Sequence, residues 1–410
     1  MTAVDTPDLL TAAGAVLDDA VALRREIHRH PEQGLLLPRT QQVVVDALAP
    51  LDLAITTGTK VTSVVADIVG AHPGPTVLLR ADMDALPMPE DTGLDFASEV
   101  DGAMHACGHD AHTAMLCGAA RVLAERRDTL AGRVRLMFQP GEEGYHGARW
   151  MIEEGVLEGP RVDAAFALHV TPNAPTGSIA TRGGPIMAAA DVLHITVRGK
   201  GGHASSPYLA NDPMPVAAEI VTALQVFATR RINQFDPVVI TVTKIRGGTT
   251  NNVIPESVMM EGTLRSVSEG SRGAARAGIA RIVEHVAAAH EMTAELEVIE
   301  GYPVVVNDID HAAFTRRVAA GLLGAESANE MPAPVMGAED FSYVLNERPG
   351  AFAYLGVCPP GERPAHAHGC HSNRMTIDEP AMRNGIAIYA ALAIEYLASG
   401  GDVRAALTSA

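Results

Sequence analysis

Short apolar strands alternate with amphipathic helices through the first part of the chain, and this alternation constrains the fold more than any other feature of the sequence. Residues 76–79, 134–138 and 164–168 are apolar runs typical of buried strands. Residues 110–127 and 146–154 lie between them and have the spacing of helices. Strands that alternate with helices form a mostly parallel sheet covered on both faces, so the sequence predicts an α/β domain. A further helix is expected at 9–29 and a further strand at 61–69.

A second kind of pattern begins near Gly183. Its strands alternate apolar with polar residues, as in Leu193, Ile195 and Val197, so one face of their sheet is expected to stay exposed. The order strand, helix, strand, strand, helix, strand is the ferredoxin-like arrangement. We therefore predict an inserted α+β domain that acts as a lid or dimerisation domain, because an exposed sheet face or edge suits a homodimer. The expected boundaries are 1–184 and 301–410 for the α/β domain and 185–300 for the insert.

The charge balance excludes several classes of function. Acidic residues outnumber basic ones, 49 against 31, and the formal net charge is −18. A nucleic-acid-binding protein needs a basic stripe, which this sequence lacks, and the negative charge disfavours anionic membranes. No apolar run is long enough to span a bilayer. Asp5 stands where a signal peptide would carry a basic residue, so we expect a cytoplasmic protein. In that location, the four cysteines are expected to be free or metal-bound rather than paired.

Side chains of the types that bind metals follow the predicted strands. Asp82 follows the first of them, Glu142 and Glu143 follow the second, and His169 ends the third. Ligands of open parallel sheets bind beyond the carboxyl ends of the strands. A lone histidine is more often a hydrogen-bonded core residue, and two adjacent glutamates also suit a solvated helix start. The joint occurrence of these groups at one sheet edge nevertheless favours a metal site, with one glutamate as ligand and the other as proton shuttle.

Two further clusters contain sulfur and imidazole. Cys107 and His109 stand two residues apart at the start of a predicted helix, a spacing at which thiolate and imidazole can bind one ion. Mixed sulfur, nitrogen and oxygen donors point to Zn, Co, Ni or Mn rather than to Ca or Mg. The second cluster lies in the loop before the last helix and consists of His366, His368, Cys370 and His371.

Taken in order along nearly the whole chain, the motifs resemble the dinuclear metal amidohydrolases, a family that includes hippurate hydrolases, N-acyl-amino-acid amidohydrolases and plant auxin-conjugate hydrolases. The resemblance implies an exopeptidase-like catalytic domain and two divalent metal ions in each subunit. The motifs are LRADMDALP at 79–87, HACGHDAHTAM at 105–115, FQPGEE at 138–143, FALH at 166–169, GKGGHA at 199–204, NVIP at 252–255, GTLR at 262–265 and EDFS at 339–342.

The resemblance also implies the metal ligands. Cys107 would take the bridging position between the two ions, which could be Zn, Mn, Co or Ni. His109 and His169 would hold one ion, and Glu143 and His371 the other. His371 is chosen because its His-Ser context matches the family. Cys370, His368 and His366 remain possible substitutes, and Asp82 remains a possible outer-shell residue.

The remaining roles implied by the resemblance concern catalysis and substrate. Glu142 would be the general base, and His203, in the insert, would reach the active site of a partner subunit and stabilise the oxyanion. Asn252 and Arg265 match positions near the substrate, although Arg265 could equally form a structural ion pair.

These roles define an expected reaction and its alternatives. The expected reaction is hydrolysis of the amide bond of small N-acyl amino acids such as hippurate, giving an amino acid and a carboxylic acid. A dipeptidase or an N-acetyl-diaminopimelate deacetylase on the same scaffold is the nearer alternative, and an inactive metal-binding module is the more distant one. Glu142 argues against the inactive module, because a structural metal site has no use for a second, unligated glutamate.

Overall fold

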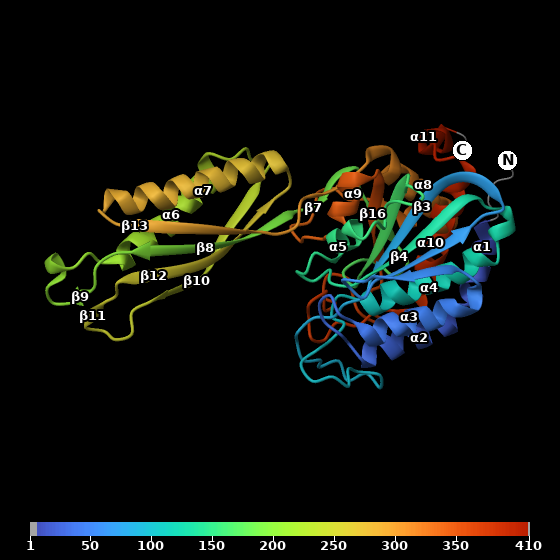
Figure 1. Cartoon of the computed structure of the whole chain (residues 1–410), viewed down its shortest axis with the longest axis horizontal. Coiled ribbons are helices and arrows are strands. Elements are labelled where there is room, and N and C mark those ends of the chain that lie inside the picture. Colours follow the sequence, from blue (N-terminus) through green and yellow to red (C-terminus); the bar gives the residue numbers. More distant parts are fainter. Residues whose placement is uncertain (1–5, 409–410) are drawn as a thin grey trace. The chain divides into compact units, whose positions relative to one another are not determined.

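The computed structural model describes residues 6–408, which divide into two compact units (Figure 1). The first unit consists of the chain up to Gly184, Val306–Ala333 and the chain from Asp340 onward. The second unit consists of Pro185–Val305 and Pro334–Glu339. Among the described residues, none of the helices combines the length and apolarity needed to cross a bilayer.

An eight-stranded mixed sheet forms the centre of the first unit. Its order is β1-β2-β4-β3-β5-β16-β6-β15, and the central strands β4, β3, β5 and β16 run parallel to their neighbours in that series. Strands β1, β2 and β6 add antiparallel pairings toward the edges. The predicted α/β class with a mostly parallel sheet is confirmed. The strands are β1 (Ala54–Thr57), β2 (Val64–Val69), β3 (His72–Asp82), β4 (Ala131–Gln139), β5 (Ala164–Thr171), β6 (Ile179–Thr181), β15 (Ala328–Glu330) and β16 (Gly350–Gly356).

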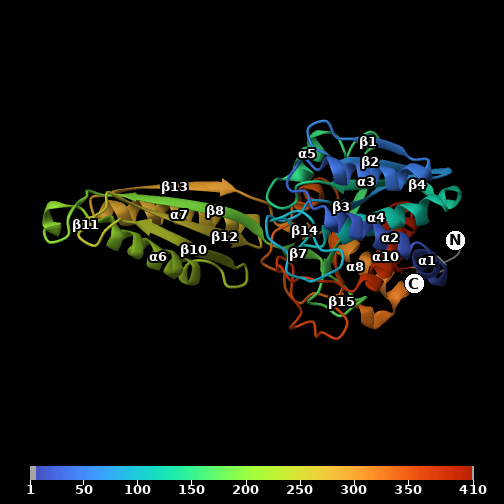
Figure 2. The same cartoon turned by 90° about the horizontal axis from the view of Figure 1, so that it is seen from below.

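Helix α4 is buried along almost its whole length and is covered by α2 and α3, as Figures 1 and 2 show. The single helix expected at 9–29 is wrong: two helices, α1 and α2, are separated at Val16. Gly14 lies in the last turn of α1, and glycine is a poor helix former. The helices of this unit are α1 (Thr6–Ala15), α2 (Leu17–Arg29), α3 (Pro38–Leu48), α4 (His109–Ala124), α5 (Gly147–Glu153), α8 (Ile309–Leu323), α9 (Ser342–Glu347), α10 (Met382–Ala398) and α11 (Val403–Thr408).

The second unit has the ferredoxin-like order that the sequence predicts. Its antiparallel sheet runs β10-β12-β8-β13, with α6 and α7 on one side (Figure 1). Leu193, Ile195 and Val197 face these helices and are buried, whereas the residues between them are more exposed. The elements are β8 (Ala189–Arg198), α6 (Pro213–Arg230), β10 (Val238–Gly247), β12 (Ser257–Ser266), α7 (Glu269–Ala289) and β13 (Thr293–Glu300), and β9 (Gly202–His203) pairs with β11 (Val253–Ile254).

Strand order in the first unit decides where its polar side chains meet. Because β3 runs parallel to both β4 and β5, the carboxyl ends of the three strands lie side by side, at what we call the carboxyl edge of the sheet. The register places Asp82, at the end of β3, beside Gln139 at the end of β4. His169 lies at the corresponding end of β5. Helix α4 begins at the same edge and brings His109 to it.

A buried carboxylate fastens the start of β8 to α7 in the second unit. Asp191 accepts hydrogen bonds from Arg272 (2.6 and 3.1 Å) and from Arg276 (2.7 and 2.8 Å). Burial by itself would raise the pKa of Asp191, but the two guanidinium groups outweigh it and lower the pKa to about 2. The carboxylate therefore stays charged throughout the physiological range and holds both arginines.

Removal of this carboxylate should destabilise the second unit. Asp191→Ala leaves two guanidinium groups without their shared partner, which should cost about 3–5 kcal/mol of unfolding free energy. Chemical denaturation followed by circular dichroism measures the change. Glu295→Ala is the matched control, because Glu295 pairs with Arg198 on the exposed surface and should leave the midpoint unchanged. Equal midpoints for the two variants would contradict a structural role for Asp191.

Candidate metal centre

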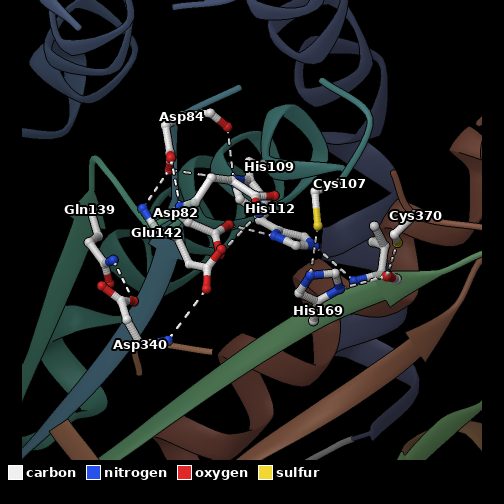
Figure 3. A network of polar contacts seen from close by, with 12 residues as sticks. Asp82, Asp84, Cys107, His109, His112, Gln139, Glu142, His169, Asp340 and Cys370 are labelled. Carbon is white, nitrogen blue, oxygen red and sulfur yellow. Dashed lines mark hydrogen bonds and ion pairs between the residues drawn. The ribbon is translucent and has the colours of Figure 1, made fainter. Parts of the chain in front are cut away.

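Two groups of side chains able to bind metal meet where β3, β4 and β5 of the first unit end, and the two groups share one residue. The ligand atoms of Cys107, His109 and His169 lie within 4.8 Å of one another, and so do those of Cys107, Glu143 and His371. Figure 3 shows Cys107, in the segment before α4, together with His109 at the start of α4 and His169 on β5. The five residues that the resemblance singled out therefore lie together, with Cys107 common to both groups.

Both buried histidines present the same ring nitrogen to this centre. The Nδ1 atom of His109 lies 2.8 Å from the carbonyl oxygen of Asp84, and that of His169 lies 2.7 Å from the carbonyl oxygen of Val170. A ring N–H that donates to a carbonyl leaves the lone pair of Nε2 available to a metal. The Nε2 atom of His109 is buried and forms no hydrogen bond with the described residues. An imidazole nitrogen in this position, facing a thiol, fits a divalent metal ion.

The glycine between Cys107 and His109 allows α4 to start close to β5. Gly108 has φ +82°, in the left-handed region. A Cβ atom added to it would lie 2.3 Å from Cγ2 of Val170, a distance at which side chains clash. Any other residue would push the start of α4 away from His169.

The second group is completed by the loop before α10. The Nε2 atom of His371 lies 3.1 Å from Oε1 of Glu143. His371 has φ +67°, which is uncommon for a residue other than glycine, and its N–H donates to the carbonyl of Ala106 at 2.7 Å. This hydrogen bond fixes the loop against the segment that carries Cys107.

Asp84 orients the glutamate pair. Its Oδ1 accepts a hydrogen bond from the backbone N–H of Glu142 (2.9 Å), and its Oδ2 accepts one from the N–H of Glu143 (3.0 Å). The Glu142 side chain is buried, and its Oε1 lies 3.4 Å from the backbone nitrogen of Asp340. Glu142 lies within 4.8 Å of His109 and Glu143 without belonging to either group that contains Cys107.

Asp82 lies behind the centre in a buried ionic network. Its Oδ2 lies 2.6 Å from Nη1 of Arg80. Its Oδ1 lies 2.6 Å from Nδ1 of His112, which Figure 3 shows beside it. Burial would raise the pKa of this carboxyl, but Arg80, His109 and His112 together hold it well below its usual range. The Nε2 atom of His112 accepts the backbone N–H of Val170 at 2.8 Å, so the network also fixes the end of β5.

Sequence reasoning missed Arg80, His112 and Asp340. His112 could have been found, because it follows His109 by three residues and so shares its face of α4. Nη2 of Arg80 lies 3.1 Å from Oδ1 of Asp340, which is distant in sequence and carries no local signal of the pairing.

The other candidates lie outside these two groups. Among the described residues, His366, His368 and Cys370 belong to none of the clusters able to hold a metal, although the Cys370 thiol lies 3.7 Å from the carbonyl oxygen of Val170. His203, Asn252 and Arg265 belong to the second unit, and their roles stay predictions.

Local contacts describe these second-unit residues further. The His203 ring is exposed, and its Nδ1 lies 2.8 Å from the Ser205 hydroxyl. Asn252 accepts the N–H of Ala204 through its backbone carbonyl at 3.0 Å. Among the described residues, none forms an ion pair with Arg265, although the charge of the Asp191 carboxylate raises the pKa of Arg265 and so opposes the effect of burial.

The fold and this centre define a metal-dependent hydrolase, and comparison with known proteins identifies its family. The model of peptidase family M20/M25/M40 matches residues 78–395, well over half of the chain. The protein belongs to this family and is a metal-dependent amidohydrolase with a dinuclear metal site.

Individual relatives span almost the whole chain. Thermostable carboxypeptidase 1 of Saccharolobus solfataricus is 39% identical over 92% of this chain and 95% of its own length. N-acetyl-L-cysteine deacetylase of Bacillus subtilis is 39% identical over 88% of this chain and 84% of its own length. The crystal structure of Bacillus subtilis YXEP, a dinuclear metal-binding peptidase of the M20 family, superposes with a TM-score of 0.80 at 35% identity, covering 94% of this chain and 99% of that one.

The position of Asp82 leads to a prediction about metal affinity. Asp82→Asn should keep both ions but weaken their binding by about 10–100-fold, because the network that orients the ligand histidines loses its charge. Metal analysis after dialysis against graded chelator measures this. Asp67→Asn is the matched control, since Asp67 also pairs with arginines of the same sheet but does not contact the centre. Unchanged affinity in Asp82→Asn would contradict the assigned position.

Proposed function

We propose that the protein hydrolyses the amide bond of N-acyl amino acids and releases an amino acid and a carboxylic acid. The observation that carries this proposal is the buried Glu142 carboxylate, which lies beside both groups of metal-binding residues without joining the two that share Cys107. A purely structural site would not need that carboxylate, whereas a hydrolase needs a group that moves a proton. The deacetylase relative, by its name, acts on an N-acyl amino acid.

In the proposed site, Cys107, His109 and His169 would hold one divalent ion, and Cys107, Glu143 and His371 would hold the other. Bound ions would supply Lewis acidity, which polarises the amide carbonyl and acidifies water. Glu142 takes a proton from the attacking water and delivers it to the leaving amine nitrogen. The backbone N–H groups of Glu142 and Glu143 donate to the Asp84 carboxylate, which fixes the backbone just after β4. The general base and the neighbouring ligand therefore keep separate positions.

We further propose that the amino-acid carboxylate of the substrate binds near Asn252 and Arg265. Arg265 is suited to this because its half-buried guanidinium lacks an ion-pair partner within the described chain. Burial lowers the pKa of Arg265 from its usual value, so a carboxylate partner would stabilise its charge.

Peptides are the second candidate substrates, because the carboxypeptidase relative, by its name, removes a terminal residue through the same kind of bond. A screen of the metal-loaded protein against hippurate, other acyl amino acids, dipeptides and N-acetyl-diaminopimelate separates the candidates. We also propose a cytoplasmic location, which the four free cysteines favour.

The two glutamates should respond differently to substitution. Glu142→Gln should retain both ions but lose about 10²–10⁴-fold in turnover, the usual contribution of a general base. Glu143→Gln, its matched neighbour, should lose metal as well as activity. Metal content measured beside the rate of amine release from hippurate decides between the roles, and the reverse pattern would interchange the two assignments.

His203 yields a prediction about assembly. We propose a homodimer in which His203 of one subunit completes the active site of the other, as the family resemblance implies. Glu142→Gln and His203→Ala homodimers should each have little activity, whereas a mixed dimer would contain one intact site. Subunit exchange between the two variants should restore activity, to at most about half of the wild-type value per mixed dimer. If mass spectrometry verifies subunit exchange and activity does not return, His203 does not act in the active site of the partner subunit.

A further inference from the structure

Two of the four free cysteines meet at the metal centre. The Sγ atom of Cys107 lies 3.4 Å from Nε2 of His169, and that of Cys370 lies 3.7 Å from the carbonyl oxygen of Val170. Both sulfur atoms therefore lie against consecutive residues at the end of β5 (Figure 3). The two side chains also interact with each other electrostatically.

The backbone holds the two cysteines in this relation. The N–H of His371, the residue after Cys370, donates to the carbonyl of Ala106, the residue before Cys107, at 2.7 Å. The peptide units that flank the two cysteines are thus hydrogen-bonded to each other. A short backbone separation together with adjacent side chains is what a disulfide requires.

We propose that Cys107 and Cys370 are a thiol-oxidation site that forms a disulfide when the centre lacks metal, with a hydroperoxide as the oxidant. The Cys370 thiol is the more exposed of the two and reacts first: its sulfur bonds to one peroxide oxygen, the O–O bond breaks, and water leaves when the oxidant is hydrogen peroxide. The Cys107 sulfur then attacks the resulting sulfenic acid and releases a second water. The two thiols together lose two electrons and two protons, which reduce the peroxide.

A disulfide between Cys107 and Cys370 would act on the metal centre itself. This part of the inference rests on the proposed function. Cys107 is the residue that both groups of metal-binding side chains share. A disulfide at Cys107 therefore removes one donor from each group at once, and the centre cannot be reloaded until a thiol reductant restores Cys107. Conversely, a bound metal occupies the Cys107 sulfur and protects it from the second step.

The other two cysteines provide internal controls. Cys117 is buried within α4, and the Cys358 thiol lies 3.7 Å from the carbonyl oxygen of Glu362. Among the described residues, neither Cys117 nor Cys358 has another cysteine as a hydrogen-bond partner. Cys358→Ser is a suitable control substitution, because a hydroxyl can donate to the same carbonyl.

The experiment compares chelated and metal-loaded protein treated with hydrogen peroxide. In the chelated wild type, thiols titrated after denaturation should fall from four to two, and non-reducing peptide mapping should find Cys107 joined to Cys370. Dithiothreitol should restore both the thiols and the capacity to rebind zinc. Cys358→Ser should form the same link, whereas Cys370→Ser should form none and should lose zinc binding irreversibly as Cys107 is over-oxidised.

The outcomes separate this inference from the proposed metal site. A chelated wild-type protein without the linking peptide, or a Cys370→Ser variant that dithiothreitol rescues as fully as wild type, would overturn the inference. In the loaded protein the link should form at least about tenfold more slowly, because Cys107 is held as a ligand. A link that forms equally fast with metal present would support the disulfide and contradict Cys107 as a metal ligand.

Discussion

The buried guanidinium of Arg80 is the constraint on which the centre depends. Arg80 lies within β3 with only 1% of its surface exposed, between the carboxylates of Asp82 and Asp340. A buried charge is costly unless it is paired, so this guanidinium requires both carboxylates to stay in place and ionised. Asp82 in turn positions His112 behind the metal ligands, and the backbone N–H of Asp340 faces Glu142. The Arg80 charge thereby connects Asp82, which lies beside the candidate metal ligands, to Asp340, which lies beside the Glu142 carboxylate.

Asp84 performs a comparable task for Glu142 and Glu143, two adjacent residues to which we assign different roles. Its two oxygens bind the consecutive N–H groups of Glu142 and Glu143, which fixes the backbone just beyond β4. With the backbone fixed, the Glu143 carboxylate lies within 4.8 Å of the ligand atoms of Cys107 and His371. Burial would raise the pKa of Glu143, but His371 and His109 outweigh it and lower the pKa, so Glu143 is ready to bind a cation.

Much of this site could be predicted from the sequence because it follows from the order of strands. Parallel strands end at one edge, so residues that follow different strands, such as Asp82 and His169, had to meet there. The Cys-x-His pair added a local spacing that needs no tertiary information. The pairing of Arg80 with Asp340 was different, since the two residues are 260 positions apart and only the folded chain brings them together. The break between α1 and α2 was missed because the apolar periodicity continues through it.

Cys107 belongs to both candidate groups, so the binding of one ion would affect the binding of the other. Hydrogen bonding to Cys370 and burial raise the pKa of Cys107 well above its usual value, so the metal-free thiol keeps its proton at neutral pH. Binding of a first ion would displace that proton, and the cost of doing so would reduce the affinity for that ion. A second ion would find a thiolate and would not bear that cost again. Repulsion between two cations would oppose this gain, and the buried carboxylates around the centre, Asp82 and Glu142 among them, would reduce that repulsion. The acidic surroundings of the Cys107 thiol therefore favour the binding of two cations over one.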